Sequence, residues 1–226
     1  VQSLDGIKDA IGNALLVVDA CQTIGSIPVD MEAVKADILC FSGHKSLFSV
    51  QGVGALYVRS GIELTPLKFG GTGSKSESIE HPAFLPDRYE CGTPNTPGIA
   101  SLLGGLTFIE KHGLGAIVDK KQRLRRLLVD GLRSLPDVVV YGHLDRGEGS
   151  YLATVAFNIE GKLPSEVGYE LNRRSIYVRV GLHCAPVAHK TIGTFPEGSL
   201  RASPGYFTSE DDIGMFVEAV RDIAGK

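Results

Sequence analysis

Three short apolar runs without alternation mark the first quarter of the chain. They are Ala14–Val18, Ile38–Phe41 and Gly54–Val58, and a helix-like stretch from about Met31 to Lys35 precedes the second run. Apolar runs of this length without polar alternate positions are typical of strands that are buried on both faces, as in a parallel sheet. The pattern therefore predicts an α/β arrangement. Polar residues directly follow the first two strands, and in open α/β sheets this edge is where ligands bind.

The middle of the chain combines an irregular stretch with two helices. Residues 60 to 96 are rich in Gly, Ser and Pro, and a segment this long without periodicity is usually functional. Its 70–74 segment (GGTGS) lacks a lysine at P-loop spacing, so an active-site loop is favoured over an anion cradle. Helices are expected from about Pro97 to Lys111 and from about Gly115 to Ser134. The second should place Ile117, Leu124, Leu127, Leu128 and Leu132 on one face, and Lys120, Lys121, Arg123, Arg125 and Arg126 on a solvated opposite face.

The last third of the chain has a different character. Residues 138 to 141, 154 to 157 and 176 to 178 have the β-branched and aromatic composition of strands, and residues 164 to 173 and 208 to 223 have helical periodicity. This mixture predicts a small α+β domain. The boundary is expected near Gly113, between the two long helices, which gives a first domain over residues 1–112 and a second over residues 113–226.

Charge and cysteine content limit the kinds of partner and compartment. The formal net charge of the 226 residues is -3, which argues against nucleic acid or an anionic membrane as a partner. No stretch approaches the roughly 20 apolar residues that a membrane helix needs. The four cysteines, Cys21, Cys40, Cys91 and Cys184, are widely spaced without a C-x-x-C pair, so they are not a disulfide framework. A reducing cytoplasm is the simplest location.

Several of these residues are also metal ligands by type. His183, Cys184 and His189 are close in sequence, as are His81 and Cys91. None of them shows the paired C-x-x-C or H-x-x-x-H spacing of a zinc site, and no metal is therefore expected.

Lys45 is the first residue that could carry chemistry. It lies in a turn of sequence Ser-Gly-His-Lys directly after a buried strand. We expect a lysine held there to be partly desolvated, which lowers the pKa of an amine and favours Schiff-base formation. On this feature alone, a solvated loop lysine is the commoner explanation.

Asp19 favours a functional role for Lys45 over a solvated loop lysine, because it lies at the end of the neighbouring strand. A carboxylate opposite an amine is what pyridoxal phosphate requires, since the anion keeps the ring nitrogen protonated and the ring electron-withdrawing. Gln22, three residues on, can donate a hydrogen bond to the ring hydroxyl oxygen. Taken separately, Asp19 could be a turn or helix-cap aspartate and Gln22 a surface amide.

Cys184 is a candidate nucleophile. A free thiol with a pKa of about 8.5 is mostly protonated at neutral pH, and His183 and Arg179 could raise its thiolate fraction. Gly181 and Pro186 flank the segment and predict an exposed loop. A lone cysteine is otherwise often a small buried hydrophobe, which is the role expected for Cys21, Cys40 and Cys91.

Five segments together resemble one enzyme family. They are residues 19–22 (DACQ), 42–45 (SGHK), 92–98 (GTPNTPG), 179–186 (RVGLHCAP) and 201–203 (RAS). Their identity and order are similar to those of class V aminotransferases, and specifically of cysteine desulfurases, over essentially the whole chain. The resemblance implies the C-terminal part of the large domain of a fold-type-I pyridoxal-phosphate enzyme, with a mostly parallel sheet and helices, followed by a small α+β domain.

The resemblance also implies roles in binding the cofactor. Lys45 would hold pyridoxal 5'-phosphate as a Schiff base and later move the proton at the substrate α-carbon. Asp19 and Gln22 would bind the ring nitrogen and the ring oxygen, and Ser42 and His44 the phosphate.

The remaining implied roles concern the substrate and a second subunit. Thr93 would reach a phosphate across the interface of a homodimer. Arg201 would clamp the substrate α-carboxylate with its bidentate fork, with Arg179 as a second substrate-binding arginine. Cys184 would attack the sulfur of L-cysteine and carry it as a persulfide, for transfer to a sulfur-acceptor protein.

Whole members of the family carry a further N-terminal stretch that contributes a phosphate-binding loop and a histidine stacked on the ring. We therefore expect a chain of this extent to bind the cofactor weakly or not at all by itself. The sequence also leaves open a selenocysteine lyase, an ordinary class V aminotransferase, and a non-enzymatic fragment that only folds or dimerises.

Overall fold

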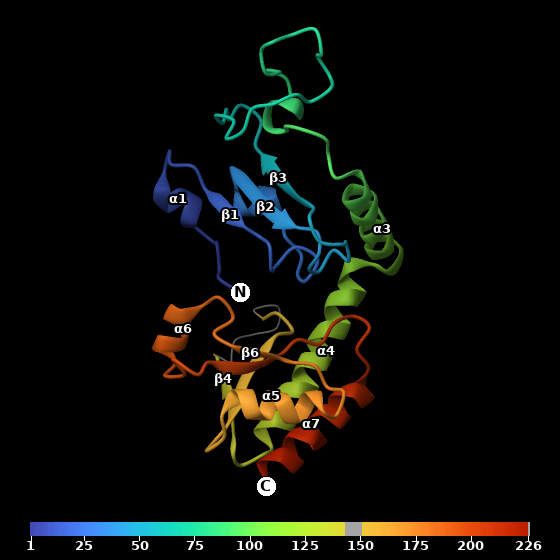
Figure 1. Cartoon of the computed structure of the whole chain (residues 1–226). Helices are drawn as coiled ribbons and strands as arrows, with labels where there is room; N and C mark the ends of the chain where they lie inside the picture. Colours follow the sequence, from blue (N-terminus) through green and yellow to red (C-terminus); the bar gives the residue numbers. More distant parts are fainter. Residues whose placement is uncertain (143–150, 226) are drawn as a thin grey trace. The chain divides into compact units, whose positions relative to one another are not determined.

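A computed structural model describes residues 1–142 and 151–225 of the chain. The chain divides into two compact units (Figure 1). The N-terminal unit is Ser3–Leu114, and the C-terminal unit is Gly115–Lys226, with which Val1–Gln2 is grouped.

The N-terminal unit contains a three-stranded sheet of order β1-β2-β3, formed by β1 (Val17–Asp19), β2 (Ile38–Ser42) and β3 (Gly54–Val58). Strand β1 pairs in parallel with β2, and β2 pairs antiparallel with β3. The return of β3 is antiparallel because no crossover helix lies between β2 and β3. The predicted α/β fold class is confirmed, and this sheet contains one parallel and one antiparallel pair of strands.

Two short helices, α1 (Ile7–Ile11) and α2 (Met31–Val34), accompany the sheet. Asp30 caps α2 by accepting hydrogen bonds from the backbone N–H groups of Glu32 and Ala33. The prediction that the first strand is buried on both faces is wrong, because the side chain of Val17 is 60% exposed. Val17 and Asp19 project from the same face of β1 and are both exposed, so this face of β1 is uncovered within the described chain.

The helix α3 (Thr96–His112) follows the irregular stretch, which contains only the short 3-10 turn η1 (Asp87–Tyr89). Asn95 caps the start of α3 by accepting a hydrogen bond from the backbone N–H of Gly98. Gly105 allows the helix to approach the turn after β2, since a Cβ at this position would lie 1.9 Å from the carbonyl oxygen of Leu47. Helix α3 thereby supports the turn that carries Lys45.

The C-terminal unit is a four-stranded antiparallel sheet of order β4-β5-β7-β6 with helices. Its elements are α4 (Leu114–Arg133), β4 (Val138–Tyr141), β5 (Val155–Ile159), α5 (Pro164–Asn172), β6 (Arg179–Gly181), α6 (Pro186–Thr191), β7 (Ser199–Ala202) and α7 (Glu210–Ala224). Side chains from α4, α5 and α7 pack with Phe157 and Leu200 into one buried core against one face of this sheet. Because side chains alternate along a strand, Ser199 and Arg201 of β7 lie on the opposite face.

Three details of the C-terminal unit differ from the sequence expectations. The strand expected over residues 176–178 is found at β6 instead. The sequence does not predict β7 or α6. None of these three elements (β6, β7 and α6) contains a long apolar run, which is the pattern that predicts a buried strand. Arg125 is not solvated: its side chain is buried and its guanidinium lies 4.0 Å from the ring centroid of Tyr151. Leu127, expected on the apolar face, is 40% exposed.

Within the part of the chain that the structure describes, no helix has both the length and the apolar composition required to cross a bilayer.

Candidate functional site

The candidate site in the N-terminal unit is the carboxyl edge of the three-stranded sheet. Asp19 is the last residue of β1 and Ser42 the last residue of β2. Because these strands are parallel and Asp19 is in register with Cys40, both carboxyl ends reach the same edge. Lys45 lies in the turn that immediately follows Ser42.

The turns after β1 and β2 are fastened to each other. The hydroxyl groups of Ser26 and Ser46 share a hydrogen bond. Gly25 has a φ of +76°, and a Cβ there would lie only 2.5 Å from the carbonyl oxygen of Ser46. This close backbone approach requires glycine and fixes the Lys45 turn beside the turn that follows Asp19.

Asp19 is exposed, and its carboxylate is held by the residue two positions on. Its Oδ1 accepts a hydrogen bond of 2.9 Å from the backbone N–H of Cys21. The pKa of Asp19 is lowered, first by a hydrogen bond from the Cys21 thiol, then by that backbone bond, and also by the positive charge of Lys45. The carboxylate is therefore ionised, and the field of Lys45 reaches it.

Cys21 is a component of this site that the sequence interpretation treated as structural. The Asp19 carboxylate and burial raise the pKa of its thiol, while Ser42 and the charge of Lys45 act in the opposite direction. Asp19, Cys21, Ser42 and Lys45 thus form one electrostatically coupled group. The only sequence signal for Cys21 is its place between Asp19 and Gln22.

The other residues predicted at this edge differ in their surroundings. Ser42 Oγ is buried and makes no hydrogen bond of ordinary geometry within the described chain. Gln22, His44 and Lys45 are exposed. The expected partial desolvation of Lys45 is therefore wrong for this chain, because Lys45 itself is exposed although other residues of its turn are buried.

Thr93 lies in the exposed segment just before the cap of α3. Among the described residues, no hydrogen bond or ion pair joins Thr93 to Asp19, Ser42 or Lys45. The structure therefore brings together the first two sequence motifs, and no described bond connects Thr93 to them.

A second group of predicted residues lies in the C-terminal unit. Arg179 of β6 and Arg201 of β7 are register partners on neighbouring antiparallel strands. Arg179 is exposed, whereas Arg201 is half-buried and its Nε is buried without a hydrogen-bond partner in the described chain. Two adjacent guanidinium groups, one with a free buried donor, suit a carboxylate ligand.

Cys184 is exposed, as its flanking sequence predicts. It lies in a tight turn closed by a hydrogen bond of 2.8 Å from the Ala185 N–H to the Leu182 carbonyl oxygen. His183 and Cys184, the two central residues, have φ values of +49° and +63°. The turn therefore holds the thiol at its tip in a backbone conformation that side-chain-bearing residues rarely adopt.

His183 is one of the two residues predicted to raise the thiolate fraction of Cys184, and its own pKa is lowered. Burial lowers its pKa most, followed by the charge of Arg201; the bond to Ser199 acts in the opposite direction, and His189 and Arg179 lower the pKa by smaller amounts. Its imidazole is consequently neutral at neutral pH. Arg179 and Arg201 remain the cationic groups near this turn.

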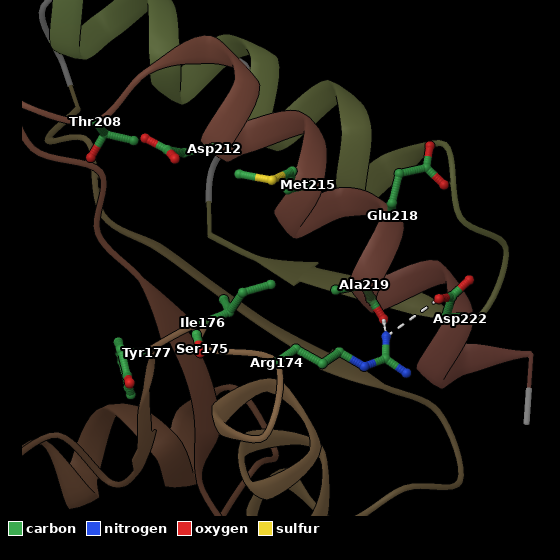
Figure 2. A pocket seen from close by; sticks show the side chains of 10 residues that line it. All are labelled: Arg174, Ser175, Ile176, Tyr177, Thr208, Asp212, Met215, Glu218, Ala219 and Asp222. Carbon is green, nitrogen blue, oxygen red and sulfur yellow. Dashed lines mark hydrogen bonds and ion pairs between the residues drawn. The ribbon is translucent and has the colours of Figure 1, made fainter.

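A separate groove of about 890 Å³ lies between α7 and the segment after α5 (Figure 2). It is lined by Arg174, Ser175, Ile176, Tyr177, Thr208, Asp212, Met215, Glu218, Ala219 and Asp222. Figure 2 shows Arg174 directed at α7, where its Nη1 donates to the Ala219 carbonyl oxygen at 3.0 Å and lies 3.5 Å from Asp222 Oδ2. The cation of this groove is thus already paired, and the groove contains none of the residues predicted to be catalytic.

The histidines and cysteines considered for a metal are not gathered into a ligand set. Among residues 1–142 and 151–225, no group of three or more His, Cys, Asp or Glu side chains could hold a metal ion.

Comparison with curated proteins finds relatives over nearly the whole chain. A probable cysteine desulfurase from Pyrococcus abyssi is 33% identical over 219 residues, which cover 93% of this chain and 52% of that protein. The cysteine desulfurase of Shigella flexneri is 36% identical over 217 residues, which cover 93% of this chain and 51% of that protein. The chain therefore spans about half the length of the curated relatives it matches.

Solved structures give the same result. A cysteine desulfurase from Thermococcus onnurineus superposes with a TM-score of 0.82 at 31% identity, covering 97% of this chain and 55% of that chain. The cysteine desulfurase CsdA from Escherichia coli superposes with a TM-score of 0.79 at 26% identity, covering 93% of this chain and 51% of that chain. The family model described as aminotransferase class-V matches residues 1–216. The chain belongs to the aminotransferase class-V family.

Proposed function

We propose that the protein carrying this chain is a pyridoxal-phosphate-dependent cysteine desulfurase. It converts L-cysteine to L-alanine and retains the sulfur as a persulfide on Cys184. The observation that carries this proposal is the pairing of β1 with β2, which brings the Asp19 carboxylate within the electrostatic reach of Lys45. An ionised carboxylate and a lysine at the carboxyl edge of a parallel strand pair are the two groups that the cofactor requires.

The side chains at this edge fit pyridoxal phosphate. Asp19 offers an ionised acceptor for a ring N–H, and Lys45 offers an exposed amine for an aldehyde. Ser42 Oγ is buried and makes no hydrogen bond of ordinary geometry within the described chain, although it lies close enough to the Cys21 thiol to lower its pKa, so its O–H is available to a phosphate oxygen. When bound, the cofactor supplies an electron-withdrawing ring that stabilises negative charge at the substrate α-carbon.

Lys45 and Asp19 have complementary tasks in this proposal. The Lys45 amine binds the cofactor covalently and, once released, takes the proton from the substrate α-carbon. Asp19 stays ionised and keeps the ring nitrogen protonated. The Cys21 N–H and thiol hold the Asp19 carboxylate in this state and orientation.

Cys184 and the two arginines act on the substrate. Arg201, with Arg179 beside it, binds the substrate α-carboxylate. The Cys184 thiolate attacks the substrate sulfur, so that an S–S bond forms and the C–S bond breaks. The bonding electron pair of the C–S bond stays with the carbon fragment, which is protonated to L-alanine.

A homodimer is part of the proposal. Thr93 is exposed and unbonded within the described chain, and it is proposed to bind the phosphate in the site of a second subunit. A sulfur-acceptor protein would then remove the persulfide from Cys184.

Borohydride trapping tests the cofactor site. After incubation with pyridoxal phosphate and reduction, peptide mass spectrometry should find the label on Lys45 in the wild type and in a Lys35→Arg control. It should find none at this position in Lys45→Arg. If Lys45 is labelled neither in this chain nor in a longer protein that contains it, the chain has only a folding or dimerisation role.

Cys184→Ser separates the enzymatic alternatives. We expect it to abolish sulfur release from L-cysteine and to spare exchange of the substrate α-proton with D₂O. Unchanged sulfur release would contradict a nucleophilic role for Cys184. Turnover of selenocysteine alone would indicate a selenocysteine lyase, and amino-group exchange without sulfur release in the wild type would indicate an ordinary aminotransferase.

A further inference from the structure

The segment that presents Cys184 is short and conformationally unfavourable. Only residues 182–185 separate the end of β6 at Gly181 from the start of α6 at Pro186. Turns with positive φ at both central positions usually contain Asn and Gly, whereas this turn contains His183 and Cys184. A turn of this kind needs an external restraint to persist.

His183 supplies that restraint through a single hydrogen bond. Its Nε2 lies 3.0 Å from the carbonyl oxygen of Ser199. Since a carbonyl oxygen only accepts, the imidazole is the Nε2–H tautomer and donates. Ser199 begins β7, the strand that pairs with both β5 and β6, and its side chain is fully buried.

The second side of the imidazole faces α6. The ring centroids of His183 and His189 are 5.7 Å apart. His189 is buried, and its Nδ1 lies 2.7 Å from Thr194 Oγ1. The His183 ring is therefore placed between the carbonyl oxygen of β7 and the helix that follows the Cys184 turn.

The groups that face His183 are consistent with a role in positioning the Cys184 turn and not with a bond to the Cys184 sulfur. Arg201 and Arg179 act on it from β7 and β6, and His189 acts on it from α6. As a neutral imidazole it has one N–H, which Ser199 already uses. It has no second N–H with which to donate to the Cys184 sulfur.

We propose that His183 is a positioning residue that fastens the Cys184 turn to β7 and thereby fixes the direction in which the thiol is presented. The role of Cys184 as sulfur acceptor rests on the proposed function. The fastening itself does not, because it depends only on the bond to Ser199 and the left-handed backbone.

Two substitutions separate the hydrogen bond from the backbone strain. His183→Phe keeps a ring between β7 and α6 and removes the donor. His183→Asn suits a positive φ but is too short to reach Ser199. His112→Phe is the matched control, since it removes another bond from an imidazole to a carbonyl oxygen, His112 Nδ1 to Phe108, at the end of α3.

Hydrogen exchange of this chain, without cofactor, tests the fastening. In His183→Phe and His183→Asn, the Ala185 amide should exchange about 10-fold faster or more, while amides of α5 and β5 exchange at wild-type rates. His112→Phe should leave the Ala185 amide unchanged. Wild-type exchange at Ala185 in both His183 variants would overturn the proposal, whether or not the protein is a desulfurase.

Comparison of the rate of sulfur release with the rate of substrate α-proton exchange tests the consequence for sulfur transfer. In the active protein, His183→Phe should lower the rate of sulfur release from L-cysteine by about 10-fold to 100-fold, because small misplacements of reacting atoms have effects of this size. Exchange of the substrate α-proton, which depends on Lys45, should stay within about two-fold of wild type. Equal losses in both rates, or retention of sulfur release in His183→Phe, would overturn the positioning role. Absence of sulfur release in the wild type would instead overturn the proposed function. The amide hydrogen-exchange result for Ala185 would remain valid in that case.

Discussion

Asp37 and Asp19 are carboxylates at opposite ends of the same small sheet, and their surroundings differ. Asp37 precedes β2 and is 4% exposed. Its carboxylate lies 2.6 Å from Lys8 Nζ and 3.7 Å from Arg59 Nη1, and it accepts a hydrogen bond of 2.8 Å from the Leu16 N–H. Both oxygens of this carboxylate thus have a partner within the unit.

Asp19, at the carboxyl end of β1, is exposed and has only local bonds. Its partner is Cys21, and the charge of Lys45 acts on it without an ion pair. Ser42 Oγ, at the same edge, is buried and makes no hydrogen bond of ordinary geometry within the described chain. The amino end of the sheet thus uses its charge to stabilise the fold, whereas the carboxyl end leaves its polar groups available to a ligand.

Asp19→Asn should have the largest effect and tests whether the carboxyl end of the sheet serves activity rather than stability. Asparagine keeps the size of the side chain but cannot hold a ring nitrogen protonated. We expect sulfur release to fall by about 10²-fold or more, as when other preorganised electrostatic groups are removed. The midpoint of urea unfolding should not decrease. Activity within about three-fold of wild type at saturating cofactor would mean that Asp19 has no role in the proposed site.

Ser42→Ala should give the next largest effect. Loss of one hydrogen bond to a charged phosphate corresponds to about 10-fold weaker cofactor binding, measured by absorbance titration of the protein. Stability should change little, since the hydroxyl makes no hydrogen bond of ordinary geometry within the described chain. Ser49→Ala is the matched control: its hydroxyl bonds to the carbonyl oxygens of Val50 and Gly98, so it should lower stability and not the cofactor affinity.

Asp37→Asn tests the opposite end. Removing this charge leaves Lys8 without its anionic partner, and we expect Tm to fall by roughly 5 °C. Below the unfolding transition, the rate of sulfur release should equal that of the wild type. A loss of activity in folded Asp37→Asn protein would show that the two ends of the sheet are not functionally separate.

The pH dependence of stability follows from the same carboxylate. The Lys8 ammonium first, then the Leu16 N–H, hold the pKa of Asp37 below its usual value, against the effect of burial. Because the folded pKa is lower than the unfolded one, this contribution is complete above the unfolded pKa and is lost as the pH falls through the folded pKa. Urea unfolding between about pH 5 and pH 2 should therefore lose less stability in Asp37→Asn than in wild type. Parallel losses in both proteins would contradict this assignment.

The sequence predicts which residues lie at the carboxyl edge of the sheet better than it predicts how exposed these residues are. The apolar runs that end at Asp19 and Ser42 are strong strand signals, and the parallel pairing then follows from topology. The exposure of Val17 and Lys45 depends on what covers the sheet, which no local pattern encodes. Strand β7 and the bond from His183 to Ser199 were missed for a related reason: four residues with alternating polarity carry little periodic signal, and a bond to a backbone carbonyl has no residue-type signature.

The smallest expected effect concerns Cys21, and it reports on the carboxyl edge without cofactor or turnover. The Asp19 carboxylate raises the pKa of the Cys21 thiol more than any other group does. In Asp19→Asn that pKa should fall, and the thiolate is the form that reacts. Iodoacetamide labelling of Cys21 at pH 8, followed by peptide mass spectrometry, should therefore be a few-fold faster than in wild type. Asp37→Asn, with an equal change in net charge at the other end of the sheet, should leave the rate unchanged. If both variants accelerate labelling equally, the effect arises from net charge or loosening of the unit, and the electrostatic coupling of Asp19, Cys21 and Lys45 is not local to this edge.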